Sequence, residues 1–396
     1  MQPADIYQQR VIDLEHDLKT IYILKILSPS EGNDMNRLSF LLILMLSVIC
    51  HYVPASAASD PPATKNSPAA GDTATPEAST ATVIKKKKQT GHLKEIALFV
   101  LSKDGRIAVT ADEDEINFLW DMKSGTLLRQ IGKPEAVRLR VVTAAFSPDS
   151  SQLLWARLGK TTPVLWDVES GRRVGVLSSK DKGHTSNIIS MTFSSDGRYI
   201  ATGDAEGTVV VWNRADRSVM RRIRAHSGEV RFLKFVPGKN ELASAGSDGA
   251  VRLWGVYGTE LLATLLEPSE RTVTALTTSV DGHFLYAALD DMTVKGWTVS
   301  LRRLRGTLAF DNRLINSIAV SPDGDYMAVT EENESILLWS IHDSRVAWKR
   351  DLDKSATQVL FSTDGKRVLT SGGDKWVREW DVASGNLLRK TGGQGD

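Results

Sequence analysis

Seven tryptophans recur through the C-terminal part of the chain at nearly constant spacing. They are Trp120, Trp166, Trp212, Trp254, Trp297, Trp339 and Trp380. The intervals between them are 46, 46, 42, 43, 42 and 41 residues, and each tryptophan ends a short β-like run such as TVVVW or SILLW. A period of this length is typical of a repeat architecture, because one supersecondary unit buries its apolar face only against the next unit.

A turn signal precedes the tryptophan in each repeat. In five repeats an Asp followed by Gly lies 16 residues before the tryptophan, at Asp104, Asp196, Asp281, Asp323 and Asp364. Asp149 lies 17 residues before its tryptophan, and the fourth repeat has Pro237-Gly238 instead. Asp-Gly between apolar runs favours a tight hairpin, since glycine adopts positive φ readily.

Each repeat contains four β-like runs. In the first repeat they cover residues 96–102, 106–112, 116–122 and 126–131. Short strands separated by regular turn signals predict an all-β fold, and seven four-stranded units predict a seven-bladed β-propeller. Each repeat supplies its own outermost strand, so we expect the blades to follow one another in sequence. A strand from the preceding TVIKK segment would compete with this closure.

The residues around the tryptophans resemble the WD-repeat family over residues 91–396. The Trp-Asp pair itself occurs at Trp120, Trp166 and Trp380, and the companion Gly-His occurs at His92 and His184, with Ala225-His226 as a variant. Each of the three histidines lies 28 residues before a tryptophan, which chance does not explain. The resemblance implies a non-catalytic scaffold that binds protein or peptide partners on one face and needs no cofactor or metal.

The resemblance also implies a hydrogen-bonded network of His, Ser or Thr, an acid and Trp within a blade. The residues it assigns to three such networks are His92, Thr110, Asp114 and Trp120; His184, Thr202, Glu206 and Trp212; and His226, Ser244, Asp248 and Trp254. Glu206 stands where an aspartate is expected, so we expect a looser network in the third repeat. Buried polar groups in a β-core need partners, which favours a structural role for these residues over a catalytic one.

Charged residues at two recurring loop positions predict the partner-binding face. One position precedes the acidic network residue, and the other leads into the innermost strand; loops on a rigid scaffold are free to carry function. The candidates are Glu95, Glu113, Glu229, Arg231, Arg271, Asp290, Arg313 and Glu332. Acids in repeats one, five and six favour a partner with a basic patch.

No catalytic motif occurs in the sequence, which lacks G-x-S-x-G, H-E-x-x-H and the P-loop. We therefore expect no enzyme. A formal net charge of +1 gives no reason to expect a nucleic-acid partner, and we expect a monomeric propeller. The alternative is a propeller hydrolase or lactonase with its site in the central channel.

Residues 35–57 have the three parts of a secretory signal peptide. Arg37 is followed by the uncharged run 38–50 and by the small-residue site Ala55-Ser56-Ala57. Thirteen residues are too few to cross a hydrocarbon core of ~30 Å as a helix, which favours a cleaved signal over an uncleaved membrane anchor. We expect a periplasmic or extracellular protein. Cleavage would remove Cys50, the single cysteine, which suits an oxidising compartment.

Two further segments precede the repeats. Residues 1–34 carry several acids ahead of the apolar run, contrary to a signal n-region, and are predicted to be a non-native N-terminal extension. Residues 58–90 are rich in Ala, Thr, Pro and Ser and are predicted to be a disordered linker, because they bury too little apolar surface to offset the entropy of ordering.

Overall fold

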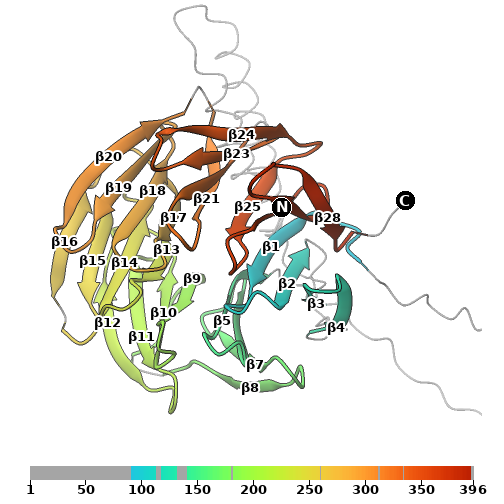
Figure 1. Ribbon diagram of the computed structural model, residues 1–396. Helices are drawn as coiled ribbons and strands as arrows, with labels where there is room; N and C mark the ends of the chain where they lie inside the picture. Colours follow the sequence, from blue (N-terminus) through green and yellow to red (C-terminus); the bar gives the residue numbers. More distant parts are fainter. Residues whose placement is uncertain are drawn as a thin grey trace, which may run out of the picture. The chain divides into compact units, whose positions relative to one another are not determined.

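The computed structural model describes residues 91–112, 117–131, 141–179, 182–258, 260–310, 313–332 and 334–393. The expected extension 1–34, signal peptide 35–57 and linker 58–90 lie outside these residues. The described residues form strands and turns with no helix, arranged as seven four-stranded antiparallel sheets. Among them, therefore, no helix has the length and apolarity to cross a membrane. The predicted seven-bladed β-propeller is confirmed (Figure 1).

Each blade runs in chain order from its innermost to its outermost strand. The innermost strands are β1 Ile96–Leu101, β5 Val141–Phe146, β9 Ile188–Phe193, β13 Val230–Phe235, β17 Val273–Thr278, β21 Ile315–Val320 and β25 Ala356–Phe361. The second strands are β2 Ile107–Asp112, β6 Gln152–Arg157, β10 Tyr199–Asp204, β14 Glu241–Gly246, β18 Phe284–Leu289, β22 Tyr326–Glu331 and β26 Arg367–Gly372. The third strands, which carry the repeated tryptophans, are β3 Asn117–Asp121, β7 Val164–Asp167, β11 Thr208–Asn213, β15 Val251–Gly255, β19 Thr293–Thr298, β23 Ser335–Ser340 and β27 Val377–Asp381. The outermost strands are β4 Thr126–Gln130, β8 Arg173–Val176, β12 Val219–Arg224, β16 Leu261–Leu266, β20 Arg303–Ala309, β24 Arg345–Asp351 and β28 Leu387–Thr391.

Apolar side chains pack between neighbouring blades. Seven buried clusters correspond to the seven blade interfaces; one of them, for example, joins Leu253 of blade 4 to Val273 and Leu285 of blade 5. Because every blade buries both of its faces, the middle strands read as nearly continuous apolar runs, as the sequence showed. The tryptophans are part of these interfaces, and Trp212 is 1% exposed.

The ring closes between blade 7 and blade 1 with each blade keeping its own four strands. One apolar cluster packs Leu369 and Val377 of blade 7 against Ile96 of blade 1. The Phe99 amide of β1 also donates a hydrogen bond to Oε1 of Gln358 on β25, at 2.5 Å. The predicted sequential closure is confirmed, and the TVIKK segment lies outside the described residues.

The turn between the first two strands of a blade is built by a serine and an aspartate. In blade 1, Ser102 donates its hydroxyl to Asp104 at 2.6 Å and accepts the amide of Ile107 at 2.9 Å, while Gly105 adopts φ 70°. Burial raises the pKa of Asp104, but hydrogen bonds from Ser102 and Arg106 outweigh it and lower that pKa to about 2. The positive φ predicted from Asp-Gly is confirmed, whereas the recurring serine two residues earlier was missed.

In blades 3, 6 and 7 the outermost strand contacts the next blade through the residue nine positions after the repeated tryptophan. In blade 3, Arg221 donates to the carbonyl of Gly255 in blade 4 at 3.0 Å. In blade 6, the Trp348 indole donates to the carbonyl of Val382 in blade 7 at 2.8 Å. In blade 7, Arg389 donates to the carbonyl of Lys123 in blade 1 at 2.9 Å. We call this position the bridging position.

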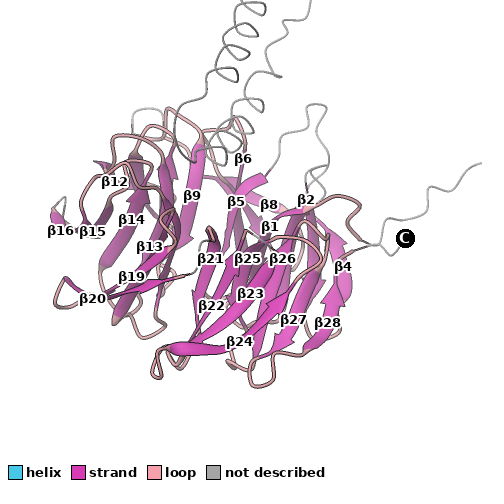
Figure 2. Cartoon of the chain, turned by 90° about the horizontal axis from the view of Figure 1, so that it is seen from above, coloured by secondary structure: helices cyan, strands magenta, loops and turns pink. Residues whose placement is uncertain are grey.

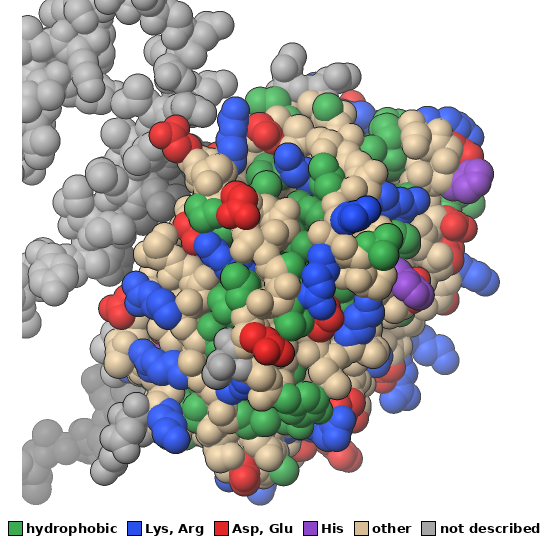
Figure 3. Space-filling model, turned by 90° about the vertical axis from the view of Figure 1, so that its left-hand side faces the viewer, with side chains coloured by type: hydrophobic (Ala, Val, Ile, Leu, Met, Phe, Trp, Pro, Cys, Tyr) green, Lys and Arg blue, Asp and Glu red, His purple; other side chains and the backbone are tan. Residues whose placement is uncertain are grey.

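Basic residues are common on the outermost strands. Six of these seven strands carry Arg or Lys, and β16 is the exception. Asp351 on β24 is the single acid among the seven strands. The space-filling view of the side near β16 and β20 shows Lys and Arg side chains spread among apolar patches (Figure 3). A charged edge strand resists pairing with other chains, so this composition protects a fold that leaves seven edges at its periphery.

Candidate functional site

Blades 1 and 3 contain the same buried hydrogen-bonded chain. In blade 3, the Trp212 indole donates to Thr202 Oγ1 at 2.8 Å, and Thr202 Oγ1 lies 2.7 Å from His184 Nε2. His184 Nδ1 lies 2.7 Å from an Asp204 carboxylate oxygen. Both His184 and Asp204 side chains are fully buried. The arrangement satisfies four polar side chains inside an apolar blade interface.

The partners define which atom donates each proton in this chain. A carboxylate accepts only, so Nδ1 of His184 carries a proton and donates it to Asp204. Thr202 Oγ1 accepts the Trp212 indole proton and lies within hydrogen-bond distance of His184 Nε2. Burial raises the pKa of Asp204, but hydrogen bonds from His184 and from the amides of Thr208 and Glu206 outweigh burial and lower it. Asp204 is therefore a carboxylate with every nearby donor directed at it.

The acid of blade 3 is Asp204 and not Glu206, which corrects the sequence assignment. Glu206 contributes only its backbone amide, 3.0 Å from Asp204 Oδ1. The network is also no looser than the others, since both histidine contacts are 2.7 Å. Asp204 ends β10, so its side chain reaches the histidine directly from the strand.

Blade 1 needs the same correction. His92 Nδ1 lies 2.8 Å from Asp112, and His92 Nε2 lies 2.6 Å from Thr110, which also accepts the Trp120 indole at 2.7 Å. Asp114, the residue assigned from the sequence, lies outside the described residues. The missed signal is the shared Thr-x-Asp of repeats one and three, which places the acid two residues after the hydroxyl.

Blade 4 reaches the same result with an acid from the turn. His226 lies 2.8 Å from Asp248 and 2.8 Å from Ser244, which accepts the Trp254 indole at 2.9 Å. Gly246 occupies the place of Asp204, and a Cβ there would lie 2.4 Å from the His226 ring. Burial lowers the pKa of His226, and nearby Arg252 lowers it further against the opposing hydrogen bond from Asp248. The glycine lets the turn aspartate reach the ring.

The other four blades hold their tryptophans without a histidine. In blade 7 the Trp380 indole donates to Thr370 at 3.0 Å. In blades 2 and 6 the hydroxyl is replaced by Trp155 and Val329, and the indole nitrogens of Trp166 and Trp339 have no acceptor among the described residues. The His network is therefore an addition to the blade and not a requirement of it.

The two loop positions of the predicted partner face lie together at one end of the blades. In five blades the amide of the residue just before the acidic position predicted from the sequence donates to the carbonyl just ahead of the innermost strand. The pairs are Ala205 with Asn187, Ser247 with Glu229, Asp290 with Thr272, Glu332 with Leu314, and Gly373 with Ser355, at 2.9 to 3.1 Å. Both loop sets therefore belong to one of the two loop-bearing faces between which the strands run (Figure 2). We call it the entry face.

The charges on the entry face differ in how far they are neutralised. Arg231 lies 3.6 Å from Glu229, and Arg271 lies 4.0 Å from the Asp291 carboxylate, both as loose and partly exposed pairs. Glu95 and Glu332 are exposed and form no ion pair with described residues, and the same holds for half-buried Asp290. Arg313 is likewise without a carboxylate partner in this part of the chain, and Glu113 lies outside the described residues. Three acids thus remain available on this face.

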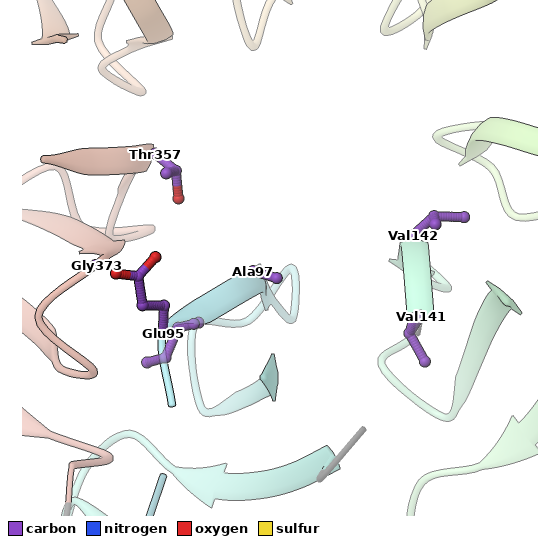
Figure 4. Close-up of a pocket in the computed structure, with 7 residues that line it drawn as sticks. Glu95, Ala97, Val141, Val142, Thr357 and Gly373 are labelled. Atoms are coloured by element: carbon purple, nitrogen blue, oxygen red, sulfur yellow. The ribbon is translucent and has the colours of Figure 1, made fainter. Parts of the chain in front are cut away.

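A hollow opens at the mouth of the central channel on the entry face. It is lined by Glu95, Ala97, Val142 and Thr357 among others, from blades 1, 2 and 7 (Figure 4). Glu95 and Thr357 lie on one side of the opening and Val142 lies across from them. One carboxylate among small and apolar side chains suits contact with a partner better than acid–base chemistry, which needs paired groups.

Lys234, on an innermost strand, is a residue that the sequence analysis missed. It lies on the innermost strand β13 and is solvent-exposed, yet the protein around it lowers its pKa by desolvation. It forms no ion pair with a described residue. The sequence contained a sign of this residue: at the fifth position of the innermost strand, blade 4 carries a lysine, whereas the other six blades carry small, hydroxyl or apolar residues.

The described residues contain no group of three or more His, Cys, Asp or Glu side chains placed to hold a metal ion. His283 and His342 are exposed and pair with neighbouring carboxylates, Asp281 and Asp343, at their own turns.

Comparison with known proteins assigns the fold to a family. A family model described as the IFT122 first beta-propeller matches residues 140–396, which is more than half of the chain and covers blades 2 to 7. The chain belongs to this family. It is a WD-repeat β-propeller, as the tryptophan, histidine and aspartate positions indicated.

WD-repeat proteins with diverse names are similar to this chain. Periodic tryptophan protein 2 of Arabidopsis thaliana is 25% identical over 65% of this chain and 29% of its own length. Target of rapamycin complex subunit wat1 of Schizosaccharomyces pombe is 26% identical over 62% of this chain and 78% of its own length. A guanine nucleotide-binding protein subunit beta of Oryza sativa is 26% identical over 52% of this chain and 57% of its own length. The match thus spans only about a third of the first of these relatives and over half of the others.

Proposed function

We propose that the chain is a non-catalytic WD-repeat scaffold that binds a protein or peptide partner on its entry face. The observation that carries the proposal is the repeated backbone pairing that gathers the loop residues of at least five blades on that face. Two of the three relatives named above are subunits of complexes by their names, which supports a scaffold.

The partner surface that fits this face is basic. Glu95, Asp290 and Glu332 come from blades 1, 5 and 6 and have no ion pair among the described residues. Complementary charges across an interface raise the association rate and select the partner. A partner with clustered Arg or Lys would neutralise these acids, whereas an acidic partner would meet them as like charges.

The test is an affinity pull-down of the full chain from its native source. We expect a partner at stoichiometric amounts, and replacement of Glu95, Asp290 and Glu332 together by Ala should reduce its recovery at least tenfold. The control replaces Glu169, Glu260 and Asp343, three exposed acids of the opposite turns, by Ala. Equal recovery with both triple variants would reject the entry face, and a bound metal with substrate turnover would favour a channel enzyme instead.

We also propose that the propeller works outside the cytoplasm as a monomer. Residues 91–396 contain no cysteine, so the folded part has no thiol to oxidise. Cell fractionation with N-terminal sequencing is the test, and a mature protein beginning near residue 58 in the exported fraction is the expected result. Cytoplasmic protein with residues 1–34 intact would contradict both export and the predicted non-native extension, and protein retained in the membrane with residues 35–57 intact would indicate the anchor.

A further inference from the structure

Blades 2, 4 and 5 carry Gly175, Ala263 and Gly306 at the bridging position and so have no bridging side chain there; the Arg217 side chain fills the space beside Gly175. Gly306 stands where blades 3, 6 and 7 carry Arg221, Trp348 and Arg389, which reach the next blade. Its cross-strand partner on β19 is also a glycine, Gly296. A Cβ on Gly306 would have no heavy atom within 4 Å, so the place that a bridging side chain fills elsewhere is empty.

A groove of about 210 Å³ lies between blades 5 and 6, and Arg305, the residue before Gly306, is one of its lining residues. Tyr286 pairs with Gly296 across β18 and β19, and its ring lies where a side chain on Gly296 would be, since a Cβ there would fall 2.8 Å from the ring. Phe284 lies beside it, with ring centroids 6.3 Å apart. A dry cavity of about 150 Å³ holds a benzene molecule, so this groove has room for one long side chain of a partner.

The same groove has an excess of negative charge. Asp323 and Asp325 of blade 6 line it together with Asp281 of blade 5, against one permanently charged cation, Arg305. Asp281 is paired with a histidine at 2.7 Å, whereas Asp325 has no hydrogen-bond or ion-pair partner for its side chain among the described residues.

Asp325 reverses a charge that other blades keep. Fourteen residues before the tryptophan, blades 1 and 3 carry Arg106 and Arg198, which pair with their turn aspartates at 2.8 and 2.6 Å. Blade 7 carries Lys366 at this position. In blade 6 an acid follows the turn aspartate instead, so Asp323 and Asp325 are left without the usual cation.

The aromatic floor already accommodates a guanidinium. Arg305 lies over the Phe284 ring at 4.6 Å from its centroid. Flat aromatic faces attract cations, and Arg and Lys stems pack on apolar surface while their charged heads reach carboxylates. Aromatic walls with acids at the rim therefore select a cationic side chain with an apolar stem.

We propose that the groove between blades 5 and 6 is a peptide-docking site that receives an Arg or Lys side chain of a protein partner. The stem lies against Tyr286 and Phe284 in the space left by Gly306, and the charged group lies at Asp323 and Asp325. This site goes beyond the entry face, because it lies between the side surfaces of two blades near their first turns.

The test is selection of phage-displayed random dodecapeptides on the biotinylated full chain, after depletion on the Gly306→Trp variant. That variant places in blade 5 the residue that blade 6 carries at Trp348, and depletion removes peptides that bind the entry face. We expect enriched sequences to share an Arg or Lys. The synthetic peptide should bind Gly306→Trp and Asp325→Arg at least tenfold more weakly than wild type by fluorescence polarisation, and a peptide with that residue changed to Gln should also lose binding.

The control is Leu388→Trp, which adds an indole to the exposed strand β28 away from the groove and should bind the peptide as wild type does. Thermal melting shows whether Gly306→Trp and Asp325→Arg remain folded. If Gly306→Trp does not fold, Asp325→Arg alone serves as the groove variant for depletion and binding. No enrichment, enrichment of sequences without a cation, or equal binding by both groove variants would each overturn the site while leaving the entry-face proposal intact.

Discussion

Blades 4 and 5 are neighbours with the same four strands but are stabilised in different ways. Blade 4 buries His226, Ser244 and Asp248 around its tryptophan, whereas blade 5 has Ala287 and Leu289 at the positions of Ser244 and Gly246. Apolar packing between blades is therefore sufficient to form a blade. The polar network adds directional bonds inside the interface, and positions without such a task, such as Gly306, become hollows.

The largest expected effect comes from removing the hydroxyl at the centre of a network. Thr202→Val in blade 3 leaves the Trp212 indole and His184 Nε2 without their shared partner, and each unsatisfied buried group costs ~1–3 kcal/mol, so we expect a loss of about 3 kcal/mol. Urea unfolding of both proteins measures it. Thr277→Val in blade 5, the same change outside a network, should alter stability by less than about 0.5 kcal/mol. Equal effects would show that the networks contribute no special stability.

Glycine substitutions sharpen the contrast between the two blades. Gly246→Ala puts a Cβ 2.4 Å from the His226 ring, and overpacking of this kind costs ~1–3 kcal/mol. Gly306→Ala meets nothing within 4 Å and replaces a flexible residue within a strand, so it should stabilise by roughly 0.5 kcal/mol. Melting temperatures that change in the same direction would contradict the hollow at Gly306.

Giving blade 6 the hydroxyl it lacks should stabilise it. Val329 occupies in blade 6 the position of Thr202 in blade 3, which accepts the Trp212 indole proton. Val329→Thr therefore places an acceptor next to the unsatisfied Trp339 indole nitrogen. A buried hydrogen bond contributes ~1 kcal/mol net, and we expect a gain of about that size in urea unfolding. Val294→Thr, on the third strand of blade 5, is the control and should destabilise, since it buries a hydroxyl outside a network. Destabilisation by both would argue that the indole already has a partner.

The smallest effect is a pH dependence from blade 4. Burial lowers the pKa of His226 below its unfolded value of about 6.5, so the unfolded chain binds more protons as the pH falls and stability decreases from pH 7 towards pH 5. His226→Gln should flatten this part of the profile, although it lowers stability at all pH values. A wild-type slope in His226→Gln would assign the pH dependence to other groups.

The sequence was sufficient for the architecture because the repeat is local. The tryptophan period, the Asp-Gly turns and the run length define each four-stranded unit, and seven similar units close only as a ring. The resemblance to the WD-repeat family, applied at these spacings, identified the histidine, the hydroxyl and the tryptophan of three networks. It failed for the acid of blades 1 and 3, because Asp112 and Asp204 reach the histidine from the strand end and Asp248 reaches it from the turn.

What the sequence determined by itself is the strand order within each repeat, the positive-φ turns and, through the family resemblance, the histidine, hydroxyl and tryptophan of the networks. Only the tertiary structure decided what lies between repeats. The bridging contacts of Arg221, Trp348 and Arg389, and the groove beside Gly306, depend on which side chain one blade turns towards the next. A glycine within a strand reads as a weak β-former in the sequence. Its role beside the groove becomes visible only in the tertiary structure, because Asp323 and Asp325 of the neighbouring blade line the same groove.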